Sequence, residues 1–218
     1  MPKIWVIVLG VVVAAVAAAA VYLNVSSEPT GMQTAEASEP EQASVEVGPN
    51  EHIIGDVDAP VTIIEYASLT CPHCANFHTE VLPEVKEQLL DTGKARLVYR
   101  DFPLDQLALR AAALVRCAQP LQRPALLSLL FKRQGSWAAS DNPMEGLDRI
   151  GRGVGMSSEA VQQCLQDQDV LDAVIAQRLE GEQKFNVSST PSFIIGGKLY
   201  SGGLSADEIA ELVAEQTP

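Results

Sequence analysis

Two cysteines separated by two residues, Cys71-Pro72-His73-Cys74, constrain this chain more than any other feature of its sequence. They follow an apolar, β-branched run over residues 61–66 that is typical of a buried strand. After them comes a stripe of apolar residues at helical spacing, formed by Phe77, Val81, Leu82, Val85 and Leu89. This order places Cys71 at the N-terminus of a helix, where a thiolate is stabilised. A thiolate beside a second thiol can exchange disulfides, so the pattern indicates thiol–disulfide chemistry.

Two other uses of a Cys-x-x-Cys motif fit this sequence less well. Zinc usually needs four ligands, and His73 and His78 lie on the same predicted helix as the two cysteines, with no second Cys-x-x-Cys pair in the chain. A purely structural disulfide across so short a loop removes little entropy from the unfolded chain. We therefore predict neither a metal nor another cofactor.

The composition narrows the class of protein further. The net charge of −13 over 218 residues argues against nucleic-acid binding, which selects basic surfaces. Four cysteines are too few for a small domain held together by disulfides, but an even number can pair completely in an exported chain. The length suits one folded domain with additional segments.

Residues 1–25 are predicted to be a membrane anchor or a signal peptide. Lys3 precedes an uncharged run over residues 4–23, which is long enough to span a membrane. Small residues at 18–20 offer a cleavage-like site, but Val21-Tyr22-Leu23 continues the apolar run beyond it, which favours an uncleaved anchor. With Lys3 inside, the remainder faces the oxidising side of the membrane, the periplasm. Residues 26–50, rich in Ser, Glu, Pro and Ala, are predicted to be a flexible linker.

The folded part is predicted to be an α/β domain with a helical insertion. Strands are expected at residues 61–67 and 96–99, on either side of the active-site helix, in which Pro83 is expected to produce a kink. Helical patterns fill residues 104–185, with a loop over 136–143, and a Gly196-Gly197 hairpin and a final helix capped by Ser205 follow. A β-α-β unit implies a parallel strand pair with a right-handed crossover.

Together with Thr190-Pro191 before the hairpin, the Cys71-Pro72-His73-Cys74 motif resembles the DsbA-like branch of the thioredoxin-fold oxidoreductases, over roughly residues 50–216. The resemblance implies a thioredoxin-like fold formed by residues 51–103 and 186–218, with an inserted α-helical domain at 104–185. The apolar helix and disordered linker described above would precede it. It also implies a periplasmic enzyme that introduces disulfides into unfolded or folding exported proteins. A DsbB-like, quinone-linked membrane oxidase would then reoxidise it, and with no dimerisation module visible we expect a monomer.

The motif residues receive distinct roles. Cys71 is the expected nucleophile, with its pKa lowered by the helix N-terminus, and Cys74, one turn further in, is expected to be buried and to resolve the mixed disulfide. Pro72 suits the first helical turn, where its missing N–H costs nothing. His73 is expected to add a positive charge near the Cys71 sulfur.

Further site residues are expected away from the motif. The resemblance implies a cis peptide bond at Pro191, with the Thr190 backbone free to pair with an extended substrate. The best-known oxidases have valine at the position of Thr190, and its hydroxyl is expected within reach of the Cys71 sulfur. Glu65, six residues before Cys71, is either a buried proton relay or a strand-end residue that reaches water. His78 is expected at the surface, and His52 is given no role.

Cys117 and Cys164 lie within the helical insertion, and their chemical state can be interpreted in two ways. In an oxidising compartment they can form a structural disulfide, which some DsbA-like proteins contain, and this is the pairing we predict. Two buried free thiols are the alternative.

Two alternative functions stay open at this point. Thr190 also fits a disulfide isomerase or reductase that a membrane partner keeps reduced. The helical insertion also fits a chaperone-like binding module without redox activity.

Overall fold

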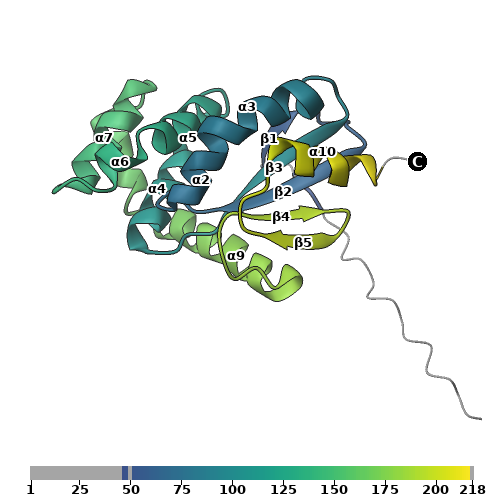
Figure 1. Ribbon diagram of the computed structural model, residues 1–218. Helices are drawn as coiled ribbons and strands as arrows, with labels where there is room; N and C mark the ends of the chain where they lie inside the picture. The colour runs from purple at the N-terminus through teal and green to yellow at the C-terminus, as the bar shows by residue number, and fades with distance from the viewer. Residues whose placement is uncertain (1–45, 49–50, 217–218) are drawn as a thin grey trace, which may run out of the picture. The chain divides into compact units, whose positions relative to one another are not determined.

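The computed structural model describes residues 46–48 and 51–216, which build a mixed five-stranded sheet with helices on both faces (Figure 1). The strand order is β1-β3-β2-β4-β5. The strands are β1 (His52–Gly55), β2 (Val61–Ala67), β3 (Ala95–Asp101), β4 (Ser192–Ile195) and β5 (Lys198–Ser201). β2 and β3 are parallel, and the other three neighbouring pairs are antiparallel. β1 is not among the predicted strands, because it is as short as β4 and β5 but has no hairpin turn signal beside it.

The helix after β2 is continuous over residues 72–90 but changes its hydrogen-bond pattern along its length. It passes through α2 (Pro72–Asn76), the π-helical η1 (Phe77–Val81), α3 (Leu82–Val85) and the π-helical η2 (Lys86–Leu90). At the end of η1 the Leu82 N–H donates to the Phe77 carbonyl, five residues back. Pro83, which has no N–H, follows this π-type turn directly, so the hydrogen-bond pattern changes where the sequence predicts a kink.

The helical segment between β3 and β4 comprises α4 (Gln106–Cys117), α5 (Arg123–Lys132), α6 (Gln134–Trp137), α7 (Pro143–Gly153), α8 (Ser158–Cys164) and α9 (Gln168–Phe185). Side chains cap several of these helices, since Asp105, Asn142, Ser157 and Asp167 each accept a hydrogen bond from the first helical turn. The predicted loop over residues 136–143 is wrong at its start, because α6 extends to the buried Trp137.

The C-terminal hairpin and helix follow the prediction. Gly196 and Gly197 take φ values of 57° and 75°, the left-handed conformation that a two-residue hairpin turn between β4 and β5 requires. Helix α10 (Ala206–Ala214) begins with a capping box in which Ser205 and Glu208 satisfy each other's backbone N–H groups. α10 packs beside α3 on one face of the sheet, while α9 lies against the other face (Figure 1).

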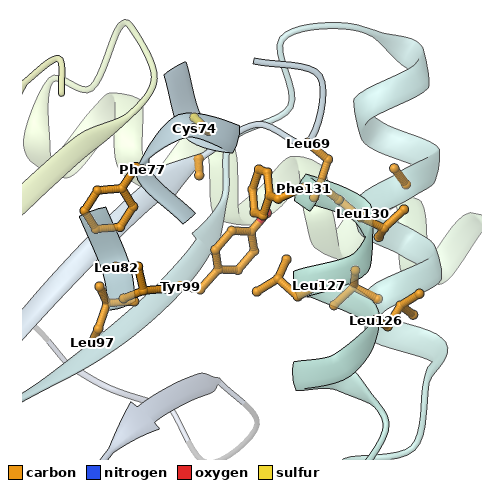
Figure 2. Close-up of a cluster of buried hydrophobic side chains, with 14 of the residues drawn as sticks. Leu69, Cys74, Phe77, Leu82, Leu97, Tyr99, Leu126, Leu127, Leu130 and Phe131 are labelled. Atoms are coloured by element: carbon orange, nitrogen blue, oxygen red, sulfur yellow. The ribbon is translucent and has the colours of Figure 1, made fainter. Parts of the chain in front are cut away.

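One hydrophobic core joins the sheet to the inserted helices. Leu97 and Tyr99 of β3 and Phe77 of the active-site helix belong to the same buried cluster as Leu130 and Phe131 of α5. Figure 2 shows the aromatic side chains of Tyr99 and Phe131 directed toward each other across this boundary. The active-site helix therefore lies at a junction that the sheet and the insertion build together.

A buried arginine organises the opposite side of β3. Arg100 is 1% exposed, and its guanidinium donates to both carboxylate oxygens of Glu51, at 3.0 and 2.6 Å. It also donates to the Tyr66 hydroxyl at 3.1 Å and to the Glu46 carbonyl at 2.7 Å. The network therefore fixes the segment before β1 to the sheet.

A disulfide links two helices of the insertion. Cys117, the last residue of α4, is bonded to Cys164, the last residue of α8, with an S–S distance of 2.03 Å and a Cα–Cα distance of 6.1 Å. Of the two readings left open by the sequence, the structure contains the disulfide.

The predicted anchor at residues 4–23 and nearly all of the predicted linker at 26–50 lie outside the described residues. Among the helices formed by residues 51–216, none combines the length and the apolar character that crossing a membrane requires.

Candidate active site

Cys71 occupies the position immediately before the active-site helix. Its extended backbone, with φ −79° and ψ 119°, makes it the N-cap of α2, and Pro72 takes the first helical position. The side chain is largely covered, with the residue 6% exposed, and its thiol donates to the Thr190 carbonyl at 3.3 Å. The predicted placement of this sulfur at a helix N-terminus is therefore seen directly.

The two thiols of the motif have opposite acidities. Hydrogen bonding from the Cys74 thiol, and then from Thr190 and the backbone N–H groups of Cys74 and His73, lowers the pKa of Cys71 to about 5 against the opposing effect of burial. Burial, followed by the hydrogen bond to Cys71 and the charge of Glu65, raises the pKa of Cys74 far above its usual range. At neutral pH one sulfur is therefore a thiolate and the other keeps its proton, which suits a nucleophile and a resolving thiol.

The acidity of Cys71 leads to a pH-dependent prediction. We expect alkylation of the reduced protein by iodoacetamide to titrate with a midpoint near pH 5, because only the thiolate reacts. The lowered pKa also stabilises the reduced fold. This contribution is complete above the unfolded pKa of about 8.5 and is lost as the pH falls through about 5. Thermal melts should show that the reduced protein gains stability relative to the oxidised protein as the pH rises from about 5 to about 8.5. A midpoint above about pH 8 would contradict the prediction.

Pro72 and His73 both lie exposed on the first turn of the helix. His73 acts on the pKa of Cys71 through its backbone N–H, whereas the sequence predicts an effect of its ring charge. An exposed imidazole next to the nucleophile is placed to meet a docking thiol or disulfide.

The loop before β4 faces Cys71 from 119 residues further along the chain. The Thr190-Pro191 peptide bond is cis, as the resemblance implies. The Thr190 carbonyl accepts a hydrogen bond from the Cys71 thiol, and the Thr190 side chain also lies within reach of this sulfur, as expected, because it contributes to the lowered pKa of Cys71. The Thr190 hydroxyl is buried and has no hydrogen-bond partner among the described residues. It is therefore free to donate to the sulfur once Cys71 becomes a thiolate, consistent with the effect of Thr190 on the Cys71 pKa.

Glu65 is fully buried in β2 and pairs with His78. The His78 Nε2 lies 2.9 and 3.1 Å from the two carboxylate oxygens, and the side chains of Glu65 and His78 are 0% and 4% exposed. The open choice for Glu65 is thereby decided in favour of burial, and the expectation that His78 lies at the surface is wrong. His78 follows Cys74 by four residues, so both point to the inner face of the helix. This spacing is the signal in the sequence that would have placed His78 inside.

Residues of the inserted helices complete the site. The His78 ring stacks on Phe131 of α5, with ring centroids 4.0 Å apart and an interplanar angle of 18°. The buried Gln134 of α6 donates from Nε2 to the carbonyls of Leu69 and Cys71, at 2.9 Å each. Sequence reasoning missed Gln134, because a single polar residue among helical patterns carries no local sign of its partners.

His52, which was given no role from the sequence, also lies in a distinctive environment. Its ring lies edge-on to Tyr99 with centroids 6.2 Å apart, and burial, reinforced by the charges of His78 and Arg123, lowers its pKa to about 4. His52 is therefore a neutral imidazole under ordinary conditions.

The similarity of this chain to known proteins agrees with this geometry. A family model described as thioredoxin matches residues 48–215. A Rickettsia felis protein, whose name assigns it protein-disulfide oxidoreductase activity, is 31% identical over 191 residues. That match covers 87% of this chain and 68% of the relative, and a similar Rickettsia bellii protein is covered over 61% of its length.

Solved structures lead to the same family. The crystal structure of Wolbachia pipientis α-DsbA1 matches with a TM-score of 0.72 and 29% identity, over 78% of this chain and 92% of its own. Oxidised BdbD from Bacillus subtilis, 20% identical with a TM-score of 0.65, shares the fold. The chain therefore belongs to the thioredoxin family and, within it, to the DsbA-like thiol:disulfide oxidoreductases.

Proposed function

We propose that this oxidoreductase works as a disulfide donor for exported proteins on the periplasmic side of the membrane. The observation that carries the proposal is the opposite acidity of the two active-site thiols. Stabilising the Cys71 thiolate stabilises the reduced form, and a stable reduced form makes the disulfide form a strong oxidant. The Rickettsia and Wolbachia relatives support the same chemistry by their names.

The proposed reaction begins with the Cys71–Cys74 disulfide. A substrate thiolate attacks the Cys71 sulfur, a mixed disulfide forms, and Cys74 leaves with the electron pair and takes up a proton. A second substrate thiolate then attacks the substrate sulfur of the mixed disulfide, which releases the oxidised substrate and the Cys71 thiolate. Because the Cys71 pKa lies near 5, this thiolate is a good leaving group.

The neighbouring residues support these steps. The backbone beside Pro191 and Thr190 offers hydrogen bonds to an extended substrate segment, which suits substrates of many sequences. Glu65 is buried and its charge raises the pKa of Cys74, which suits it to exchange the proton that Cys74 gains and loses. The Cys117–Cys164 disulfide has a structural role, because it links the last residues of α4 and α8.

The cellular setting belongs to the same proposal. A DsbB-like, quinone-linked membrane oxidase would accept the two electrons from reduced Cys71 and Cys74 and restore the disulfide. Residues 4–23 would direct the chain across the membrane and, if uncleaved, tether it there. The domain would act as a monomer.

The reduction potential of the Cys71–Cys74 pair tests the proposal. We expect equilibration of the domain with glutathione buffers to give a reduction potential near that of DsbA, about −120 mV. The two redox forms can be quantified by thiol alkylation and mass spectrometry, with a Cys117→Ser/Cys164→Ser variant to isolate the active-site pair. A value near about −250 mV would reject the donor role and favour a reductase or isomerase.

A further inference from the structure

The turn that joins β2 to the active-site helix is formed by residues 68–71. The Cys71 N–H donates to the Ser68 carbonyl at 3.1 Å and closes the turn. The central peptide, between Leu69 and Thr70, is the one whose rotation distinguishes the common types of four-residue turn. Leu69 is 1% exposed, and the N–H of Thr70 donates to the Ser68 hydroxyl oxygen at 3.5 Å. The orientation of this buried peptide therefore decides how the turn presents Cys71 to the helix.

Gln134 of the insertion holds this peptide in its orientation. Its Nε2 donates to the carbonyls of Leu69 and Cys71 at 2.9 Å each, which uses both N–H bonds of that nitrogen. The Cys71 carbonyl also accepts from the Ala75 N–H at 3.1 Å, whereas the Leu69 carbonyl receives no other hydrogen bond from the described residues. A buried carbonyl is costly to leave unpaired, so loss of Gln134 gives the central peptide a reason to rotate.

The packing around Gln134 keeps it in place. Trp137, at the other end of α6, is 1% exposed, and its indole N–H donates to the Leu130 carbonyl at 2.8 Å. Gly146 of α7 lies so close that a Cβ there would be 2.8 Å from the Cβ of Trp137. Leu69 itself packs in the same buried cluster as Leu130 (Figure 2). The donor and the turn it holds are therefore fixed to one rigid core.

A second helix of the insertion holds the same turn from its exposed side. The Thr70 hydroxyl donates to Oδ2 of Asp105 at 2.7 Å, while Oδ1 of Asp105 accepts from the Ala108 N–H and caps α4. The Leu104 N–H, just before this cap, donates to the Ser68 hydroxyl oxygen at 3.4 Å. The insertion thus contacts the turn through α6 and through the start of α4.

These contacts matter most when the active-site pair is reduced. In the oxidised protein the covalent bond to Cys74 fixes the Cys71 sulfur. In the reduced protein, which the structure describes, both cysteines are free, and only non-covalent contacts orient the sulfur. The groups that stabilise its thiolate, among them the backbone N–H groups of His73 and Cys74 and the side chain of Thr190, act only on a correctly oriented sulfur.

We propose that Gln134 is a positioning residue for disulfide exchange: it holds the Leu69 and Cys71 carbonyls so that the reduced Cys71 sulfur stays where its thiolate is stabilised. The Thr70–Asp105 hydrogen bond supports the same turn. The insertion thereby contributes to the redox balance of the active site without touching the sulfur. This inference rests on the proposed role of Cys71 as the nucleophile.

The test is Gln134→Met, which keeps the length of the side chain and removes the donor. Alkylation by iodoacetamide as a function of pH reports the acidity of Cys71, and equilibration with glutathione reports the stability of the reduced pair. We expect the alkylation midpoint to rise from about 5 to about 6. The glutathione equilibrium should shift about tenfold toward the oxidised protein, equivalent to about 30 mV, because one pKa unit corresponds to a factor of ten.

Gln122→Met is the matched control. Gln122 also donates from Nε2 to a backbone carbonyl within the insertion, that of Val154, at 3.0 Å. Its loss should lower the urea midpoint of both redox forms equally and leave the alkylation midpoint unchanged. Gln134→Met should instead destabilise the reduced form more than the oxidised form. An equal loss in both forms, with an unchanged alkylation midpoint, would show that Gln134 only supports the fold and would overturn the proposal.

Thr70→Val provides a second test that leaves the core intact. It removes the hydroxyl bound to Asp105 and should shift the alkylation midpoint in the same direction by a smaller amount, because this bond is exposed. Thr70→Ser, which keeps the hydroxyl, should restore the natural midpoint. Identical midpoints in Thr70→Val and Thr70→Ser would count against control of the turn by the insertion. A natural protein without an acidic Cys71 would instead reject the assigned nucleophile, so the two failures are distinguishable.

Discussion

Cys71→Ser is expected to abolish disulfide exchange, with activity at least about a thousandfold below that of the natural protein. The hydroxyl that replaces the thiol neither ionises near pH 5 nor forms a mixed disulfide, so the first covalent step is lost. Oxidative refolding of a reduced model protein, followed by the recovery of its activity, gives the measurement. Cys74→Ser should instead accumulate a stable mixed disulfide through Cys71, visible as a mass increase on non-reducing analysis.

The second disulfide supplies the control for this experiment. Cys117→Ser/Cys164→Ser replaces both cysteines of the insertion, which close a loop of 47 residues. We expect it to lower the free energy of unfolding by about 2–4 kcal/mol while exchange at Cys71 continues. Refolding activity that survives in Cys71→Ser would show that the nucleophile is assigned to the wrong residue.

Arg100→Met is expected to lower the free energy of unfolding by about 3–5 kcal/mol. The change leaves the Glu51 carboxylate without its buried partner and takes a donor from the Tyr66 hydroxyl. Urea unfolding of the reduced and oxidised proteins, monitored by circular dichroism, measures the effect. Arg149→Met, which removes an exposed helix ion pair with Glu145, is the control and should change stability by less than about 1 kcal/mol.

The Arg100 prediction also has a compensating variant. Adding Glu51→Gln to Arg100→Met replaces the orphaned charge with a neutral amide, so part of the lost stability should return. A loss below about 1 kcal/mol in Arg100→Met alone would show that water replaces the guanidinium and that the network contributes little.

Local patterns predicted the elements that carry the sulfurs. The β-branched run before Cys71, the apolar stripe after it and the Gly196-Gly197 turn each appear in the structure as the sequence indicates. These features depend on backbone geometry and on the burial of one face of an element. Both produce a local pattern of residue types that can be recognised in the sequence. The position of Pro191 beside the cysteines was predicted from the family resemblance and not from a local sequence pattern.

What the sequence did not predict depends on contacts between distant segments. Gln134 reaches the carbonyl of Cys71 from 63 residues away, and nothing around it distinguishes it from a surface glutamine. The interior position of His78 follows from helical spacing, but its stacking on Phe131 requires knowing how the insertion docks.

The hydrogen bonds that hold Cys71 also set an order in time. During synthesis the chain emerges from its N-terminus, so Cys71 and Cys74 appear long before Gln134 and Thr190, which are 63 and 119 residues beyond Cys71. Until Gln134 docks, the Cys71 backbone lacks one of its hydrogen bonds. Until Thr190 docks, the sulfur lacks part of the environment that lowers its pKa, and its reactivity stays closer to that of an ordinary thiol. A nascent chain therefore carries a less reactive cysteine pair and becomes a reactive catalyst only when its last strands are in place.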